Sequence, residues 1–417
     1  MESVRTNIAI LLVGAAILML GQGLLVTLLP VRGAIEGLST TWIGAMGSAY
    51  YGGFAIGCLL GPGMIRSVGH IRVFAGFAAL TAAAALMFQL VPNQWMWVAT
   101  RGFTGVCFAV LSMAIESWLN DCSTNKNRGK ILSIYIIVGN IVMAGGQLMV
   151  NLRDPAGATL FIMCALMICV SLAPIALVNL KEPTPPPSAK LRIGNLYKLS
   201  PVGFVGCLAF GIVDGAFWSL GPVFAQERGF SVAGITYFMA AFMVGGTILQ
   251  WPIGWISDRI DRRYMIVFCC FGTIGTGLTL ALIPSHEGIN AFAIAALHGG
   301  FMFPLYGLIL AHANDYAPQE KLVEISGGLL LVYGLGAVLG PTIVSPLMDR
   351  IGEGYLFLAM TIIFGSLALF AIYRIAVRPS DKIVSRATFV PAPQGSSQAF
   401  YELETDDEES EDNGKTN

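Results

Sequence analysis

The sequence predicts an all-α polytopic membrane protein, with twelve transmembrane helices arranged as two pseudo-symmetric six-helix bundles. Three observations support this fold class: the apolar composition, the spacing of the apolar runs and the distribution of basic residues. The chain of 417 residues is 55% hydrophobic and only 12% charged, about half the charge of an average soluble domain. A soluble core cannot enclose so much apolar surface, so we expect lipid as the surrounding solvent.

Twelve apolar stretches are each long enough to cross a hydrocarbon core of ~30 Å, which requires roughly 20 helical residues. They lie near 7–29, 41–64, 73–91, 95–118, 131–150, 158–179, 201–224, 232–256, 264–283, 290–313, 324–345 and 354–376. The first stretch is longer than the core of a signal peptide, and no Ala-x-Ala-like site follows it. We therefore expect it to be an uncleaved span.

Basic residues indicate the orientation. With the N-terminus inside, the cytoplasmic segments hold 19 Lys and Arg residues and the opposite side holds four. Lys and Arg concentrate on the cytoplasmic side of membrane proteins, so both termini are expected there. The sequence thus predicts a multi-pass protein of the cell membrane, in contact with the lipid bilayer.

Composition also suggests the domain boundaries. The Glu-Pro-Thr-Pro-Pro-Pro-Ser segment cannot be helical and favours extended polyproline II. The acidic end of the chain is poor in apolar residues and should be disordered. The expected units are a six-helix bundle at 1–180, a cytoplasmic linker at 181–199, a second bundle at 200–378 and an acidic cytoplasmic tail at 379–417.

The two halves contain matching features at a nearly constant offset. Gly69 corresponds to Asp261, 192 residues later, and Asn120 corresponds to Asn314, 194 residues later. Gly139 and Gly145 each match a glycine 195 residues further on, Gly334 and Gly340. Such matches indicate a duplicated six-helix unit.

A charged loop between two apolar runs carries the most specific motif, Gly-Trp-Ile-Ser-Asp-Arg-Ile-Asp-Arg-Arg. It resembles the signature loop of the major facilitator superfamily of secondary transporters, roughly Gly-x-x-x-Asp-Arg-x-Gly-Arg-Arg. The matching residues are Gly254, Asp258, Arg259, Arg262 and Arg263, with Asp261 at the place of the second glycine. The resemblance implies the superfamily fold, alternating access, and a role for Asp258 in closing the cytoplasmic side.

The corresponding loop of the first half keeps Gly69 and Arg72, but Arg66 occupies the aspartate position. In the alternative interpretation, both loops are only orientation signals and helix caps. The string Glu116-Ser117-Trp118-Leu119-Asn120 resembles a bacterial, drug/proton-antiporter-like branch of the superfamily that has no firmly assigned substrate.

Four polar residues interrupt apolar spans at similar depths. Counted from the span ends at 1.5 Å per residue, Gln22, Arg101, Asp214 and His298 lie roughly 9–15 Å below the outer face. The resemblance implies that the first, fourth, seventh and tenth spans line a central cavity. We therefore predict that these four residues form one layer around a substrate and proton site, with Asp214 as the proton carrier. The alternatives are a snorkelling Arg101 and a hydrogen-bonded core His298.

A second candidate layer lies near the cytoplasmic span ends, where Glu116 and His312 close the fourth and tenth spans. Glu116 is either a gate carboxylate or an interfacial residue at a helix end. The glycines named above, together with Pro341, allow close helix approach and a bend. Their pattern resembles the antiporter motif of the superfamily, although the proline lies in the eleventh span; simple packing is the alternative.

The most direct functional hypothesis is a secondary transporter of a small organic solute, proton-coupled and working as an efflux antiporter. The alternatives are an uptake symporter or uniporter and, from another class, a non-transporting membrane sensor. No Walker loop, nucleophile with a base, metal-ligand spacing or nucleic-acid patch is present in the sequence. We therefore expect no enzymatic activity, no cofactor, no metal and no nucleic-acid partner, and a monomer that binds its solute and H⁺.

Overall fold

The computed structural model describes residues 2–123, 128–177, 196–282, 287–317 and 322–377. The proline-rich part of the expected linker and the expected tail lie outside these residues. The helices are α1 (Glu2–Ile35), α2 (Thr40–Val68), α3 (His70–Leu90), α4 (Gln94–Asp121), α5 (Arg128–Leu148), a short 3-10 helix η1 (Met149–Leu152), α6 (Thr159–Leu177), the one-turn α7 (Leu196–Leu199), α8 (Pro201–Glu227), α9 (Val232–Ser257), α10 (Arg262–Leu282), α11 (Ile289–Asn314), α12 (Leu322–Ile351) and α13 (Tyr355–Val377).

Twelve of these helices in the described chain are long and apolar enough to cross a membrane, which confirms the predicted fold class. Several run further than their apolar core. α1 continues through Pro30 and Arg32, because Arg32 bonds to the backbone carbonyls of Pro155 and Ala156 and pairs with Glu36 at 2.6 Å. The predicted spans end near the first polar or charged residues beyond each apolar run. The helices of the structure continue past such residues, as α1 does past Arg32, whose charge is paired.

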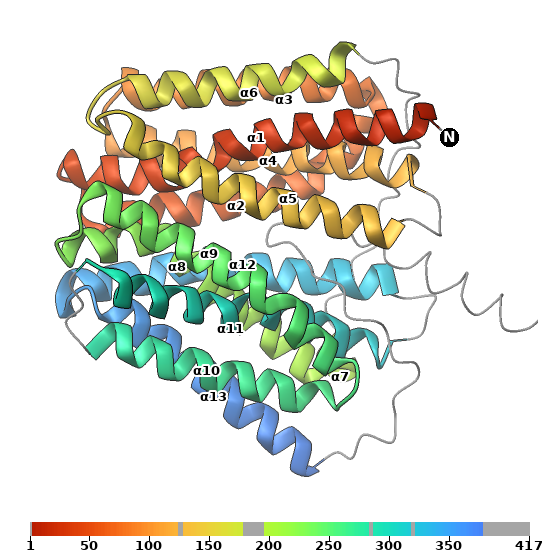
Figure 1. The fold of residues 1–417 in the computed structure, drawn as a ribbon, viewed down its shortest axis with the longest axis vertical. Coiled ribbons are helices and arrows are strands. Elements are labelled where there is room, and N and C mark those ends of the chain that lie inside the picture. Colours follow the sequence, from red (N-terminus) through yellow and green to blue (C-terminus); the bar gives the residue numbers. More distant parts are fainter. Residues whose placement is uncertain (1, 124–127, 178–195, 283–286, 318–321, 378–417) are drawn as a thin grey trace, which may run out of the picture.

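The helices form two bundles with the same internal pairing. In the first, α1 packs on α5 and α6, α2 on α4, and α3 on α4 and α6. The second repeats these pairs as α8 on α12 and α13, α9 on α11, and α10 on α11 and α13. In Figure 1 the first bundle occupies the upper half and the second the lower half. The duplication seen in the sequence is therefore also present in the packing.

Local sequence signals position the helix ends. Ser39 caps α2, Asn93 accepts hydrogen bonds from the amides of Trp95 and Met96 at the start of α4, and Ser231 caps α9. Side-chain oxygens of this kind satisfy amides that have no partner within the helix. Gly69 separates α2 from α3 with a φ of 90°, a conformation that favours glycine.

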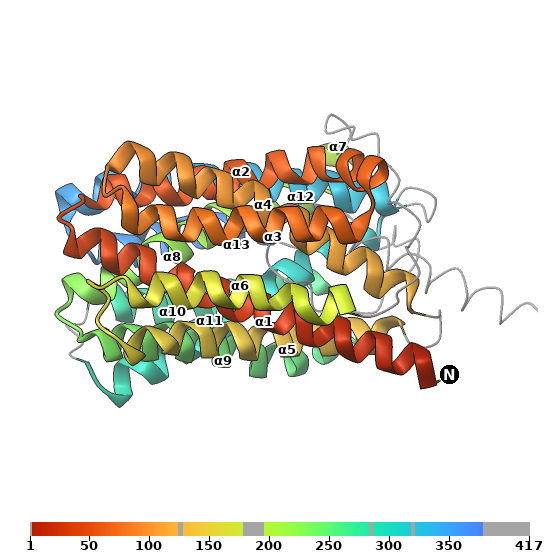
Figure 2. The same ribbon diagram turned by 90° about the horizontal axis from the view of Figure 1, so that it is seen from above.

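The helices run approximately parallel, so the molecule has two ends (Figure 2). We call the end that carries the start of α1 the near face and the opposite end the far face. Apolar side chains cover the outer surface between them, including Ile141, Ile248, Ile362 and Leu369, which are each more than 60% exposed. An apolar exterior of this extent fits lipid rather than water.

Candidate functional site

A central cavity lies between the two bundles. Its empty space is about 1730 Å³, part of it open to solvent. Side chains of α1, α2, α4 and α5 line it from the first bundle, and side chains of α8, α9, α11 and α12 line it from the second. The two halves of the duplicated unit thus face one shared cavity.

Glycines let the cavity helices approach one another closely. A Cβ on Gly211 of α8 would overlap the backbone carbonyl of Tyr333 in α12, and a Cβ on Gly340 of α12 would overlap that of Ile212. This tight α8–α12 contact brings Asp214 and Tyr333 to the same wall of the cavity.

The other predicted packing positions behave differently. A Cβ on Gly139 would lie 2.9 Å from the Met19 sulfur, and both residues line the cavity. A Cβ on Gly145 would make only ordinary contact, at 3.7 Å from Leu20, and one on Gly334 would meet open space. Pro341 lies within α12 and faces α2. Gly145 and Gly334 therefore do not mark tight helix contacts.

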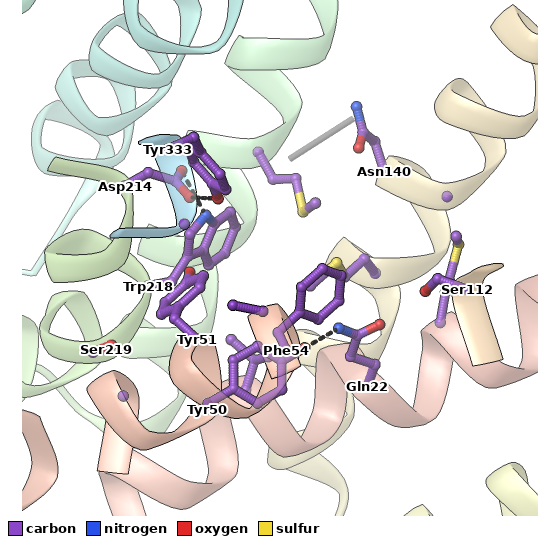
Figure 3. A pocket seen from close by; sticks show the side chains of 18 of the residues that line it. Gln22, Tyr50, Tyr51, Phe54, Ser112, Asn140, Asp214, Trp218, Ser219 and Tyr333 are labelled. Atoms are coloured by element: carbon purple, nitrogen blue, oxygen red, sulfur yellow. Dashed lines mark hydrogen bonds between the residues drawn. The ribbon is translucent and has the colours of Figure 1, made fainter. Parts of the chain in front are cut away.

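Asp214 is fully buried in the wall formed by the second bundle. Its Oδ1 accepts a hydrogen bond from Trp218 Nε1 at 3.1 Å, and its Oδ2 accepts one from the Tyr333 hydroxyl at 2.7 Å. Figure 3 shows this group on one side of the cavity. Two donors to one carboxylate hold it in a single orientation at the cavity surface.

Arg101 lies in the wall formed by the first bundle and is 9% exposed. Its guanidinium carbon lies 4.2 Å from the centre of the Tyr50 ring, and the Tyr50 hydroxyl accepts a hydrogen bond from Gln22 Nε2 at 2.9 Å. An arginine charge at the bilayer centre costs about 2.5–3.5 kcal/mol by the lower estimates. A desolvated cation–π contact offsets about 2 kcal/mol of this cost.

Tyr51 lines the same cavity, and Figure 3 shows it between Tyr50 and Asp214. Gln22, Arg101 and Asp214, which the sequence analysis placed in one layer, therefore line the same cavity. Tyr50, Tyr333 and Trp218 also line the cavity and were not among the predicted site residues. Of these three, Trp218 was the easiest to predict, because it follows Asp214 by four residues and residues four apart on a helix are neighbours.

The structure places His298 elsewhere, which corrects the predicted four-residue layer. Its Nδ1 lies 2.8 Å from the Thr276 hydroxyl of α10, and its ring packs edge-on against Phe357 of α13. Phe303, on the same helix, does line the cavity. Five helical residues correspond to a rotation of about 140°, so His298 has a suitable depth but points away from the cavity.

The predicted second layer is also divided. Glu116 is buried and lines the central cavity, where it receives a hydrogen bond from the Tyr135 hydroxyl. His312 instead lies in a small separate pocket at the near face, beside Asp261, Asp315 and Tyr316. Glu116 belongs to the shared cavity, whereas His312 belongs to the second bundle alone.

The signature loop forms a compact ion-pair network at the near face. Arg262 donates to Asp315 at 2.9 Å and to Asp258 at 3.2 Å, and Arg263 pairs with Asp261 at 2.6 Å. Burial raises the pKa of Asp261, but hydrogen bonds and charge from Arg263 outweigh burial, so the net pKa lies below its ordinary value. These pairs join residues of one bundle.

The remaining motif positions lie outside the described ion-pair network. Arg259 stacks on the Trp255 ring at 3.5 Å, and Gly254 is buried in the last turn of α9. In the corresponding loop of the first half, Gly69 forms the turn and Arg72 is exposed. Arg72 is therefore more exposed than Arg262 and Arg263 of the second loop, which are both buried.

Among the residues that the structure describes, a set of hydrogen bonds joins the two bundles from the middle of the molecule to the far face. Asp349 of α12 accepts bonds from the backbone amides of Thr40 and Thr41 at 3.1 and 2.9 Å, at the start of α2. Ser48 Oγ lies 2.7 Å from the Thr342 hydroxyl. Further pairs are Thr40–Glu227, Asn140–Thr247 and Asn151–Thr236. We call these contacts the far-face seal.

Across the described residues, no group of three or more His, Cys, Asp or Glu side chains is arranged to hold a metal ion.

Comparison with known proteins identifies the family. The sequence profile of the Major Facilitator Superfamily matches residues 11–341. An uncharacterized MFS-type transporter of Enterobacter sp. (strain 638) is 27% identical over 369 residues, covering 86% of this chain and 93% of that protein. The uncharacterized MFS-type transporter YcaD of Escherichia fergusonii is 28% identical over 357 residues, covering 84% and 91%.

Solved structures share the fold. The nucleoside transporter NupG superposes with a TM-score of 0.74 at 13% identity, covering 89% of this chain and 100% of that one. A bacterial homologue of the human lysosomal transporter Spinster, in an inward-facing and unoccupied conformation, gives 0.68 at 11% identity, covering 97% and 98%. The chain belongs to the Major Facilitator Superfamily and is a multi-pass membrane secondary transporter.

Proposed function

We propose that this transporter exports a small organic solute in exchange for protons, with Asp214 as the group that binds and releases the proton. The observation that carries the proposal is a fully buried carboxylate, held by Tyr333 and Trp218, at the surface of a cavity shared by both bundles. An ionisable side chain inside a membrane protein is most often part of an ion or substrate pathway.

Alternating access requires the two bundles to move as units around this cavity. The far-face seal supports a state that is closed at that end, because bonds such as Asp349–Thr41 and Ser48–Thr342 join α2 to α12. The distribution of basic residues supports a cytoplasmic near face with both termini inside. We propose that solute enters from the near face and that breaking the seal releases it on the other side.

Proton flux in proteoliposomes tests the role of Asp214. In proteoliposomes loaded with each of a panel of candidate solutes, we expect the wild-type protein to move protons when a solute gradient is applied. We expect Asp214→Asn to lose at least 90% of this proton flux, an effect of about 1.4 kcal/mol or more. Solute-for-solute exchange should persist in Asp214→Asn, because exchange needs no proton. The control is Asp154→Asn, which changes an exposed carboxylate of the same kind.

The same measurement separates the alternatives. Proton flux in the direction of the solute would indicate symport, and solute flux without proton flux would indicate a uniporter. Unchanged proton coupling in Asp214→Asn would disprove the assignment of Asp214. No exchange of any solute by a folded wild-type protein would favour a membrane sensor.

A further inference from the structure

We propose that the solute is an organic acid, bound as its anion through Arg101, with a flat apolar body lying along the aromatic side of the cavity. This inference rests on the proposed transport function and adds the chemical class of the solute. Among the described residues that line the cavity, the acidic and basic side chains are Arg101, Glu116 and Asp214, and they differ in their partners.

The two acids already have donors. Asp214 receives hydrogen bonds from Trp218 and Tyr333, and Glu116 receives one from Tyr135. A carboxylate that accepts hydrogen bonds is stabilised in its charged form without a cation. Neither carboxylate therefore requires a positively charged solute to stabilise its charge.

Arg101, the basic residue among the described residues that line the cavity, is partnered differently. Within the described part of the chain, no ion pair or side-chain hydrogen bond joins Arg101 to a carboxylate, although the residue is 9% exposed. Its guanidinium carbon lies over the face of the Tyr50 ring, 4.2 Å from the ring centre. A contact with a ring face is an attraction to the charge and uses none of the five N–H donors as a hydrogen bond to a carboxylate, and paired donors of this kind bind a carboxylate in a two-pronged arrangement.

A buried charge without a partner of opposite sign is costly, and a bound anion would remove that cost. Nearby polar groups suit the same ligand. Tyr50 accepts a hydrogen bond from Gln22, so its own hydroxyl hydrogen remains available as a further donor. The acidic group of a solute would thus meet Arg101 and the Tyr50 hydroxyl together.

The space beside Arg101 favours an aromatic or otherwise flat body. Tyr51 and Phe54 follow Tyr50 on α2 and line the cavity, and Trp218 and Phe303 line it from the second bundle. Figure 3 shows Tyr51 and Trp218 between the Gln22–Tyr50 pair and Asp214. A solute anchored at Arg101 would therefore place its body against these rings, where stacking contributes to affinity.

The test compares three naphthalene probes of nearly equal shape: 2-naphthoate, its neutral primary amide and 2-naphthylmethylammonium. Binding to the purified full-length protein is followed by thermal stabilisation and by tryptophan fluorescence, since Trp218 lines the cavity. We expect the carboxylate to bind at least tenfold more tightly than either of the other two probes. Equal binding of the amide or the ammonium probe, or no binding of the carboxylate at concentrations up to several millimolar, would overturn the inference.

Variants of Arg101 locate the interaction. Arg101→Gln should abolish the preference for the carboxylate, while Arg101→Lys should keep part of it, because lysine retains the charge but not the fork of donors. The control is Arg153→Gln, which removes an exposed arginine whose side chain bonds only to the adjacent Leu152 carbonyl in the structure. If Arg101→Gln does not fold, Arg101→Lys decides, and a full carboxylate preference in that variant contradicts a two-pronged contact.

The two proposals fail in different ways. Proton-coupled transport of neutral solutes that is unaffected in Arg101→Lys would disprove the organic-acid inference and leave the proposed function standing. Carboxylate binding that depends on Arg101, without solute or proton flux in proteoliposomes, would support the binding site and disprove the transport proposal.

Discussion

The two ends of the molecule hold their helices together in different ways. At the far face, hydrogen bonds cross from one bundle to the other, as in Asp349 with the start of α2 and Ser48 with Thr342. At the near face, the described salt bridges of Arg262 and Arg263 join residues of the second bundle only. One set of contacts therefore restrains the relative position of the bundles, and the other set stabilises one bundle internally.

Locking the far-face seal should have the largest effect. Ser48→Cys combined with Thr342→Cys places two thiols where the native hydroxyl oxygens are 2.7 Å apart, which suits a disulfide after small adjustment. We expect oxidation to reduce transport in proteoliposomes at least tenfold and a reductant to restore it. Each single variant, treated with the same oxidant, is the control. Full transport by the cross-linked protein would contradict a seal that must open.

Weakening the far-face seal should increase access to the cavity from the far side, and we expect this effect to be smaller than that of the cross-link. Asp349→Asn removes the charge that caps the start of α2, and hydrogen bonds to a charged group contribute about 1.5–3 kcal/mol. We expect labelling of Cys58, which lines the cavity, by an impermeant maleimide from the far side to rise about tenfold. Glu353→Gln is the matched control, because Glu353 pairs with Arg228 of its own bundle. Equal labelling in both variants would disprove the role of Asp349.

The near-face network should affect stability rather than access. The pKa of Asp261 lies below its ordinary value near 3.9, so its contribution is complete above that pH and is lost as pH falls through the lowered value. We expect Asp261→Asn to lower the free energy of unfolding by about 1 kcal/mol at pH 7 and by progressively less below about pH 4. Thermal unfolding in detergent across this pH range measures the difference.

The control for this prediction is Asp121→Asn, which changes an exposed aspartate at the near end of the first bundle. We expect its free energy of unfolding to stay within about 0.5 kcal/mol of wild type at every pH. A pH-independent loss in Asp261→Asn would indicate that packing, rather than the ion pair with Arg263, accounts for the effect.

The sequence was sufficient for the helices and for the depth of their polar residues. Apolar length predicted the twelve spans, and Gln22, Arg101 and Asp214 do share a cavity. Depth alone misled for His298, because the rotation of α11 about its axis depends on packing against α10 and α13. A sequence with glycine on several faces of a helix gives no unique rotation.

The contacts between the bundles could not be predicted from the sequence either, because they also depend on tertiary packing. Asp349 and Thr40 are 309 residues apart, and neither belongs to a motif. Their contact depends on how two complete bundles meet. By contrast, the Arg262–Asp258 and Arg263–Asp261 pairs join residues four and two positions apart, so they depend on local geometry, whereas the Arg262–Asp315 pair depends on how α10 and α11 meet.

The chemistry of the far-face seal affects how easily the transporter can change state. Its members are hydroxyls, amides and carboxylates at Thr40, Ser48, Asn151 and Asp349, rather than interlocking apolar side chains. Water entering this end can replace each lost bond with another, and the net value of a hydrogen bond is then about 0.5–1.5 kcal/mol between neutral groups and about 1.5–3 kcal/mol to a charged group such as Asp349. Opening this end would then cost only a small free energy for each bond that water replaces, so that binding of a small solute or a single proton can shift the populations of the closed and open forms.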